Sequence, residues 1–354
     1  MESTDPGALR RLRAAAPVLA LAAIAGVAWL AIGKDLTRLW SCLLLAGMLP
    51  LWIAVGALGF IALHVVVGAR WILPIRRLLE GWTAMLPLGA LALLAGWGGG
   101  ERVYRWWTKA GAEALFHSHS KQMWMVPLRW TITVALALAL IMAVRSALLR
   151  PGLRGAPLSR RSAIIALLVL VPAFSMYSWD TLLSLQAQFT SAMWGIYSLT
   201  GAVHAALGAT AVALFVFRRE LAASVPAHVR HDLGTWLVAF SCIVAYIAFA
   251  QYLIVWYANI DEEAQFFILR TQHGYGAVAL VGVALRCLVP FALLMSQHLR
   301  THPLAQLAAG AAILLGTWID LAWIVVPFFS QGEHRCLLAP PELGIGLGVL
   351  GLGL

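Results

Sequence analysis

The chain carries a series of apolar stretches, each long enough to cross a lipid bilayer. A hydrocarbon core of about 30 Å needs about 20 apolar residues in one helix, and a helix pairs its backbone groups within the segment. We therefore expect an all-α polytopic membrane protein, with residues 1–14 as a cytoplasmic tail and 15–354 as one transmembrane domain. The stretches predict ten helices, near residues 15–33, 40–68, 82–98, 124–149, 162–178, 190–217, 233–257, 272–297, 303–327 and 341–354.

The composition agrees with this class of protein. Hydrophobic residues make up 62% of the chain and charged residues 11%, and the mean hydropathy is +0.85, far above the range of soluble domains. The net charge of +10 does not indicate nucleic-acid binding, because the basic residues form short clusters between apolar stretches instead of one polar face. We expect the lipid bilayer, and not a nucleic acid, as the surroundings of the chain.

Arginine clusters in alternate connections predict the orientation. Lysine and arginine collect in short cytoplasmic loops, so the loops that carry them should all face the cytoplasm. This places the N-terminus inside and, with ten helices, the C-terminus inside as well. The loop from Glu101 to Lys121 is basic although it falls on the outer side. The clusters that set the orientation are Arg10, Arg11 and Arg13; Arg70, Arg76 and Arg77; Arg150, Arg154, Arg160 and Arg161; Arg218, Arg219 and Arg230; and Arg300.

The chain has no motif for a bound redox centre. Its four cysteines form no CxxC or CxxCH pattern and no metal-finger spacing, which gives no support for covalent haem, a cysteine-ligated cluster or structural zinc. His64 and His204 each stand alone in a predicted span, and no paired motif predicts that they ligate haem b. Each could be a hydrogen-bonded core residue or a member of a proton path.

Asp320 and Arg286 lie well inside predicted spans, and each needs a partner. A charge near the bilayer centre costs about 2.5 to 3.5 kcal/mol on insertion scales. Asp320 lies in GTWIDLAWIVVP, and Arg286 in VGVALRCLVPF is its natural counter-charge. Asp320 could be a paired carboxylate, a proton-relay member or a contact for a quinone head group, and the sequence leaves these alternatives open.

Further polar residues lie at both ends of the span near 233–257. Asp232 precedes it, where a carboxylate meets the positive end of the helix dipole. At the other end, aromatic and amide side chains of the type that bind a quinone ring precede three carboxylates. The first of these, Asp261, could cap the next helix, lie at an interface with a partner or release protons. The candidate quinone contacts are Gln251, Trp256, Tyr257 and Asn259. Tryptophans near other predicted helix ends, such as Trp106 and Trp124, are expected at the membrane interface.

Three blocks together resemble the NrfD-like integral membrane subunits of alternative complex III, in particular the second, ActF. The blocks are YSWDTLLSLQAQFTSAMWGIYSLTGA (177–202), RHDLGTWLVAFSCIVAYIAFAQYLIVWYANIDEE (230–263) and LRCLVPFALLMSQHLR (285–300). The resemblance implies two four-helix bundles with peripheral helices, in a respiratory quinol:cytochrome c oxidoreductase of the bacterial inner membrane. It also implies partners: a homologous NrfD-like subunit, an iron-sulfur protein and multihaem cytochromes c. Menaquinol or ubiquinol would be the substrate of the complex, and this chain would hold no covalent cofactor and no catalytic residue of its own.

The resemblance is incomplete at one block. The family pattern D-W-L-M-S-L-E-P-H-W-F-S is matched at Asp180 and Ser184, but Gln186 and Gln188 replace its acid and its histidine. The carboxylates that remain for a proton path are Asp180, Asp232, Asp261 and Asp320. Two other readings stay open: an NrfD-type anchor of another respiratory reductase, such as one acting on polysulfide, and a secondary transporter.

Overall fold

The computed structural model describes residues 24–33, 35–116, 119–153, 158–221, 224–272 and 274–330. Within these ranges all regular structure is helical. The expected span near 15–33 is described only from Ile24 onwards, and the expected span at 341–354 and both chain ends lie outside the described residues.

Eight segments of the described chain are long and apolar enough to cross a membrane, so the protein is an all-α, multi-pass membrane protein. They are Leu36–Val67, Arg76–Arg102, Pro127–Gly152, Arg160–Gln186, Trp194–Val216, Ala227–Ala258, Tyr275–Leu294 and Pro303–Pro327. The helices that form or connect them are α2 (Leu36–Val67), α3 (Arg76–Trp82), η1 (Thr83–Ala90), α4 (Leu91–Gly99), η2 (Gly100–Arg102), α5 (Lys109–Leu115), α6 (His119–Trp124), α7 (Pro127–Leu153), α8 (Arg160–Thr181), η3 (Leu183–Gln186), α9 (Trp194–Val216), α10 (Ala227–Ala258), α11 (Asp261–Thr271), α12 (Tyr275–Val283), the π-helical turn η4 (Ala284–Leu288), α13 (Val289–Leu294), α14 (Gln297–Thr301) and α15 (Pro303–Ser330).

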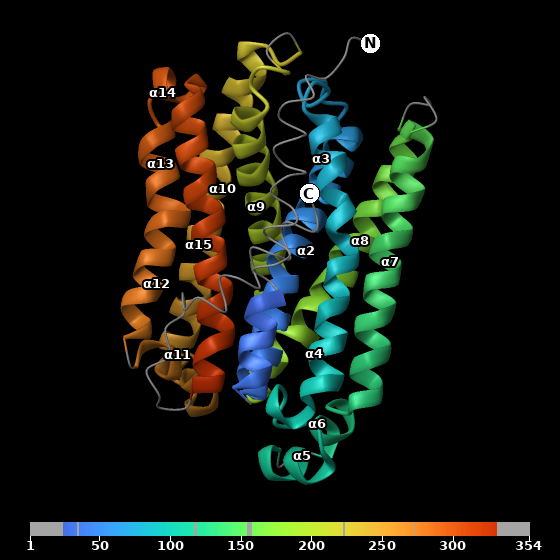
Figure 1. The fold of residues 1–354 in the computed structure, drawn as a ribbon, viewed down its shortest axis with the longest axis vertical. Coiled ribbons are helices and arrows are strands. Elements are labelled where there is room, and N and C mark those ends of the chain that lie inside the picture. The colour runs from blue at the N-terminus through green and yellow to red at the C-terminus, as the bar shows by residue number, and fades with distance from the viewer. Residues whose placement is uncertain are drawn as a thin grey trace.

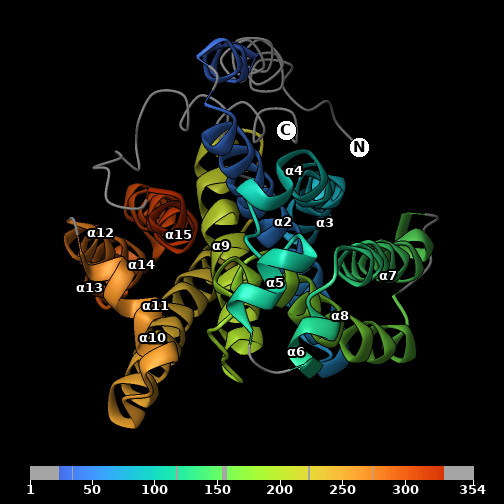
Figure 2. The ribbon, with the colours of Figure 1, turned by 90° about the horizontal axis from the view of Figure 1, so that it is seen from below.

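The spans pack as two groups of four (Figures 1 and 2). One group holds α2, α3–α4, α7 and α8, and the other holds α9, α10, α12–α13 and α15. The short helices α5, α6 and α11 lie at one end of the molecule, which we call the α11 end (Figure 1). The arginine-rich connections before α3, α8, α10 and α15 lie at the other end. Which end faces the cytoplasm stays a prediction of the sequence.

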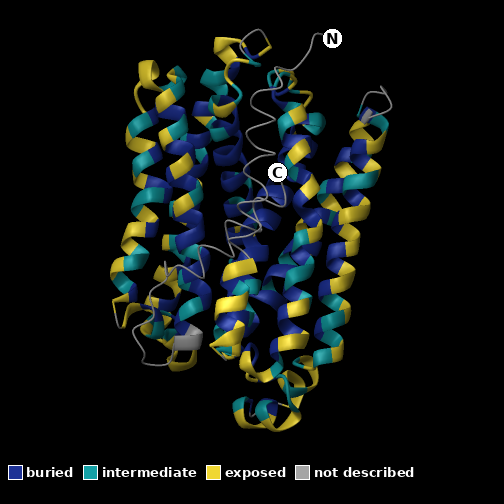
Figure 3. Cartoon of the chain, viewed as in Figure 1, coloured by how far each residue is buried: buried dark blue, intermediate teal, exposed yellow. Residues whose placement is uncertain are grey.

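Helices α2 and α9 join the two groups and form the core. They are the most buried spans, whereas α10 and α12–α13 are among the most exposed (Figure 3). Small residues let their backbones approach closely, as is common between transmembrane helices. A Cβ atom added to Gly56 of α2 would lie 2.0 Å from the carbonyl oxygen of Ala202 on α9. The contact between the two groups therefore depends on a glycine at this position.

We expect Gly56→Ala to separate α2 from α9 and to destabilise the fold by about 1–3 kcal/mol, because an added methyl group must displace backbone there. Gly81→Ala is the matched control, since a Cβ atom at this exposed helical position meets nothing within 4 Å. Thermal unfolding in detergent measures both. Equal melting temperatures for the two variants would contradict the close packing of α2 on α9.

Candidate functional site: two pockets beside buried ion pairs

A pocket of about 540 Å³ lies among α9, α10, α11, α12, η4 and α15, and we call it the α10–α15 pocket. Its size falls within the range of small-molecule sites, about 300 to 1,000 Å³. The polar side chains among its mostly apolar lining include Tyr197, Gln251, Thr271, Arg286 and Asp320. Its aromatic wall consists of Trp194, Phe249, Tyr252, Phe266, Phe267 and Trp323.

Arg286 and Asp320 form the ion pair expected from the sequence. Arg286 Nη1 lies 2.5 Å from Asp320 Oδ2, and Tyr197 donates its hydroxyl hydrogen to the same oxygen. The Arg286 side chain is 3% exposed, and Asp320 is 18% exposed on the pocket side. Within the described chain, Nε and Nη2 of Arg286 have no hydrogen-bond partner. The pocket is therefore lined by a neutralised charge pair, and two nitrogens of its guanidinium are buried behind the lining without a hydrogen-bond partner among the described residues.

The local sequence explains how Arg286 reaches this place. Pro290 has no N–H, so the carbonyl of Arg286 loses its usual helical partner, and the helix forms the π turn η4 around Arg286. Gly201 and Gly316 then leave a slot for the side chain. A Cβ atom on Gly201 would lie 2.4 Å from Arg286 Nη2, and one on Gly316 would lie 2.7 Å from its backbone nitrogen. Through this slot the guanidinium comes within 5.9 Å of the Trp52 ring of α2.

Only one of the four predicted quinone contacts lines the pocket. Gln251 is buried and accepts a hydrogen bond from Ser191 at 3.3 Å. Trp256 and Tyr257 are 65% and 85% exposed and lie outside the pocket, and Asn259 ends α10 with φ 49°. The reason is the helical period: Gln251 and Val255 share the buried face, and the next two residues turn away from it.

The remaining candidates for a proton path are spread over the molecule. His204 is fully buried, with Nε2 3.2 Å from Ser241 Oγ, and it lies one turn after Gly201 on the face that Arg286 packs against. His64 donates from Nδ1 to Phe60 O at 2.8 Å and contacts the rings of Phe60, Trp71 and Trp236. Asp232 lies at the arginine-rich end beside His231, and the exposed Asp261 begins α11. The structure thus brings only His204 close to the ion pair.

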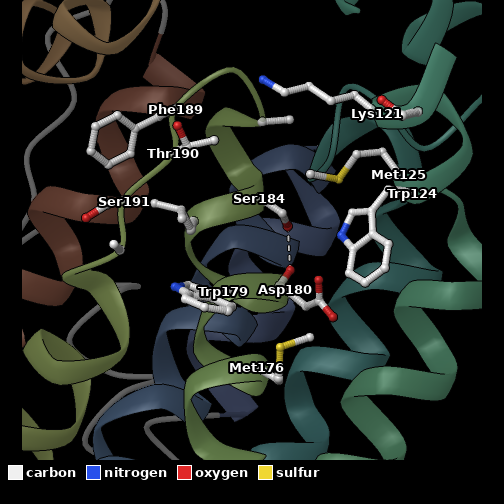
Figure 4. Close-up of a pocket in the computed structure, with 14 residues that line it drawn as sticks. Lys121, Trp124, Met125, Met176, Trp179, Asp180, Ser184, Phe189, Thr190 and Ser191 are labelled. Carbon is white, nitrogen blue, oxygen red and sulfur yellow. Dashed lines mark hydrogen bonds between the residues drawn. The ribbon is translucent and has the colours of Figure 1, made fainter. Parts of the chain in front are cut away.

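Asp180 belongs to a second pocket of about 720 Å³, the α6–α8 pocket (Figure 4). Its carboxylate accepts two hydrogen bonds from Arg129 Nη1, at 2.7 and 2.8 Å, and Arg129 lies over the Trp124 ring. In Figure 4 the residues Asp180 and Ser184 lie between Trp124 on one side and Phe189 on the other. Arg129 was not predicted as the partner of Asp180, although an arginine inside the predicted span 124–149 is a signal that a counter-charge is needed.

Three aromatic side chains hold the end of α8 beside this pocket. Trp130 donates to Asp180 O at 2.5 Å, Tyr104 to Thr181 O at 3.0 Å and Trp106 to Ser184 O at 2.7 Å. Trp106 is 1% exposed, so the expectation of an interface position is wrong for this residue. Burial raises the pKa of the Tyr104 phenol well above its ordinary value, which keeps the group protonated as a donor. These bonds satisfy carbonyls that a helix end leaves unpaired.

Arg270 of α11 is a further buried residue that the sequence analysis missed. It is 0% exposed, and it donates to Gln186 Oε1 at 2.8 Å, to Phe266 O at 2.9 Å and to Ile324 O at 2.7 Å. These contacts tie α11 to η3 and to α15 at the edge of the α10–α15 pocket. Gln186, which stands at the position of the acid in the pattern above, therefore has a definite structural role.

No protein-family model matches the chain, and no curated protein matches it. Among the described residues, no group of three or more His, Cys, Asp or Glu side chains could hold a metal ion.

We expect Asp320→Leu to destabilise the protein by about 3–5 kcal/mol, because it leaves the Arg286 charge buried without a partner. The double variant Arg286→Met, Asp320→Leu should regain much of this loss, since it removes both charges. Asp232→Leu, at a side chain that is 39% exposed, is the control and should change stability by less than about 1 kcal/mol. Thermal unfolding in detergent checks all three. A double variant that melts as low as Asp320→Leu would count against an energetically coupled pair.

Proposed function

We propose that the chain is an integral membrane subunit of a respiratory quinol:cytochrome c oxidoreductase of the alternative complex III type. In this role it supports quinol binding, proton translocation or both. The observation that carries the proposal is the α10–α15 pocket, where aromatic side chains surround the buried cluster of Tyr197, Arg286 and Asp320. The resemblance of the three sequence blocks to NrfD-like subunits supports the same reading.

The pocket suits the two parts of a quinol. Its flat ring can pack between aromatic side chains, and its two oxygens need donors and acceptors such as Tyr197, Asp320 and Gln251, which line the pocket. The isoprenoid tail needs a path to lipid. Phe249 and Tyr252 of α10 and Leu280 of α12 line the pocket and are 61%, 43% and 73% exposed, so an apolar tail can leave between these outer helices.

Quinol oxidation requires groups in the protein that accept and transfer protons. Oxidation of a quinol to a quinone releases two protons and two electrons. In the proposal Asp320 accepts a proton from the ring hydroxyl, and Tyr197, which is hydrogen-bonded to it, can continue the transfer. The hydrogen-bonded His204 and Ser241 lie further along α9 and α10 and are candidates for later steps. The electrons pass to cofactors of the iron-sulfur and cytochrome subunits, so that this chain supplies binding and proton transfer alone.

The arrangement of broken helices favours this reading over a secondary transporter. In transporters built from repeats, interrupted helices recur at corresponding positions of the two halves. Here the span Arg76–Arg102 is interrupted by η1 and is the second helix of its group, whereas the π turn η4 interrupts the third helix of the other group. An NrfD-type anchor of another respiratory reductase remains the second candidate, because the same pocket would serve it.

The partners provide the first test. A tagged chain purified from native membranes in mild detergent should bring with it a homologous membrane subunit, an iron-sulfur protein and multihaem cytochromes c, identified by mass and by haem absorbance. A reductase with a polysulfide-active or other catalytic subunit in their place would support the second candidate. A chain that purifies alone with full ligand binding would oppose both.

The pocket provides the second test. Ala279→Trp places an indole in the α10–α15 pocket and should weaken binding of a naphthoquinol analogue more than tenfold, as measured by quenching of tryptophan fluorescence. Ala277→Trp adds the same ring on the exposed face of α12, outside the pocket, and should leave binding unchanged. Equal binding by the two variants would show that the ring binds elsewhere.

A further inference from the structure

A buried cation lies directly behind the aromatic wall of the α10–α15 pocket. The guanidinium carbon of Arg270 is 3.6 Å from the centroid of the Phe266 ring and 5.9 Å from that of Trp323. Both rings line the pocket, as does Ile324, whose carbonyl accepts from Arg270 Nη2. One ring therefore separates the charge from the cavity.

No carboxylate neutralises this cation in the described part of the chain. Its three hydrogen-bond acceptors, Gln186 Oε1 and the carbonyls of Phe266 and Ile324, are all neutral, and its Nε has no partner. Burial lowers the pKa of Arg270 to about 9, which leaves the group protonated at neutral pH. Arg270 is thus a full positive charge held in place by dipoles.

The charges around the pocket do not sum to zero. Arg286 and Asp320 cancel each other, and α10 contributes no charged residue to the lining. The acidic residues Asp261, Glu262 and Glu263 lie in the first turn of α11, seven to nine positions before Arg270. At 1.5 Å per residue that is about 10–13 Å along the helix, at a surface where water and salt screen them. The buried Arg270 acts on the cavity with much less screening.

We infer that this pocket prefers the anionic form of its ring ligand, and that Arg270 is the residue that sets this preference. The inference rests on the proposed function and names the ligand state: a quinol that has lost one hydroxyl proton, or an acidic hydroxyquinone. In that step the O–H bond breaks, the proton passes to Asp320, and both electrons stay on the ring. The ring then carries one negative charge opposite Arg270.

Gln186→Glu tests the inference with little change of shape. It replaces the neutral acceptor of Arg270 with a carboxylate and cancels the positive field. Gln188→Glu adds the same charge two positions further, at an exposed side chain that donates a hydrogen bond of 3.5 Å to Leu115 O, and is the matched control. Arg270→Gln removes the cation itself and is the second variant.

The probes are 2-hydroxy-1,4-naphthoquinone, an anion at neutral pH, and the similar but neutral 2-methyl-1,4-naphthoquinone. Their dissociation constants are measured on the full-length chain in detergent by quenching of tryptophan fluorescence. We expect Gln186→Glu and Arg270→Gln to weaken binding of the anionic probe about tenfold, the effect of one unit charge at about 10 Å in a protein interior. Binding of the neutral probe should change less than twofold, which also shows that the pocket is intact, and Gln188→Glu should behave like the unchanged chain.

Each outcome decides between the two proposals. If both probes bind and the Gln186→Glu and Arg270→Gln variants keep the affinity of the unchanged chain for the anion, the charge preference is overturned and the quinol pocket stands. If Gln188→Glu weakens binding of the anionic probe as much as Gln186→Glu does, the effect is one of general surface charge and the inference is also overturned. If neither probe binds the unchanged chain, the pocket itself is not a quinone site and both proposals fail.

Discussion

The ion pair between Arg286 and Asp320 is the interaction on which the arrangement of the second helix group depends. A charge inside a membrane-spanning segment is costly unless it is neutralised, and in these two spans each residue is the counter-charge of the other. Their meeting requires the π turn in η4, the slot left by Gly201 and Gly316, and the hydroxyl of Tyr197. These features bring α9, α12–α13 and α15 together, and residues of all three spans line the α10–α15 pocket.

A similar pairing occurs in the first group. Arg129 comes from its third helix and Asp180 from its fourth, just as Arg286 and Asp320 come from the third and fourth helices of the second group. Each pair borders a pocket. The connection between α8 and α9 lines the α6–α8 pocket, and α9 lines the α10–α15 pocket. The pairs differ in depth, because Arg129 is the third residue of α7 whereas Arg286 lies in the middle of its span. Each group thus contains an arginine–aspartate ion pair, near the start of a span in the first group and in the middle of a span in the second.

Much of the fold followed from the sequence because hydropathy alone defines the described spans, and the Arg286–Asp320 pair followed because each charge demanded a partner. Other features depend on the direction in which a side chain points, and the residue types alone do not predict it. Trp256 and Tyr257 have the right chemistry for a quinone ring but lie on the outer face of α10. Arg270 was missed because its partners are an amide and two backbone carbonyls, and nothing in the pattern of residues marks carbonyls as partners.

The contact of Gly56 with Ala202 has a consequence for motion. Two halves that touch backbone to backbone through their most buried helices cannot rock about their common boundary without opening a void in the middle of the protein. Any rearrangement on ligand entry must then involve the peripheral helices α10 and α12, which are among the most exposed spans. The centre of the protein then keeps its structure while a ligand enters between outer helices.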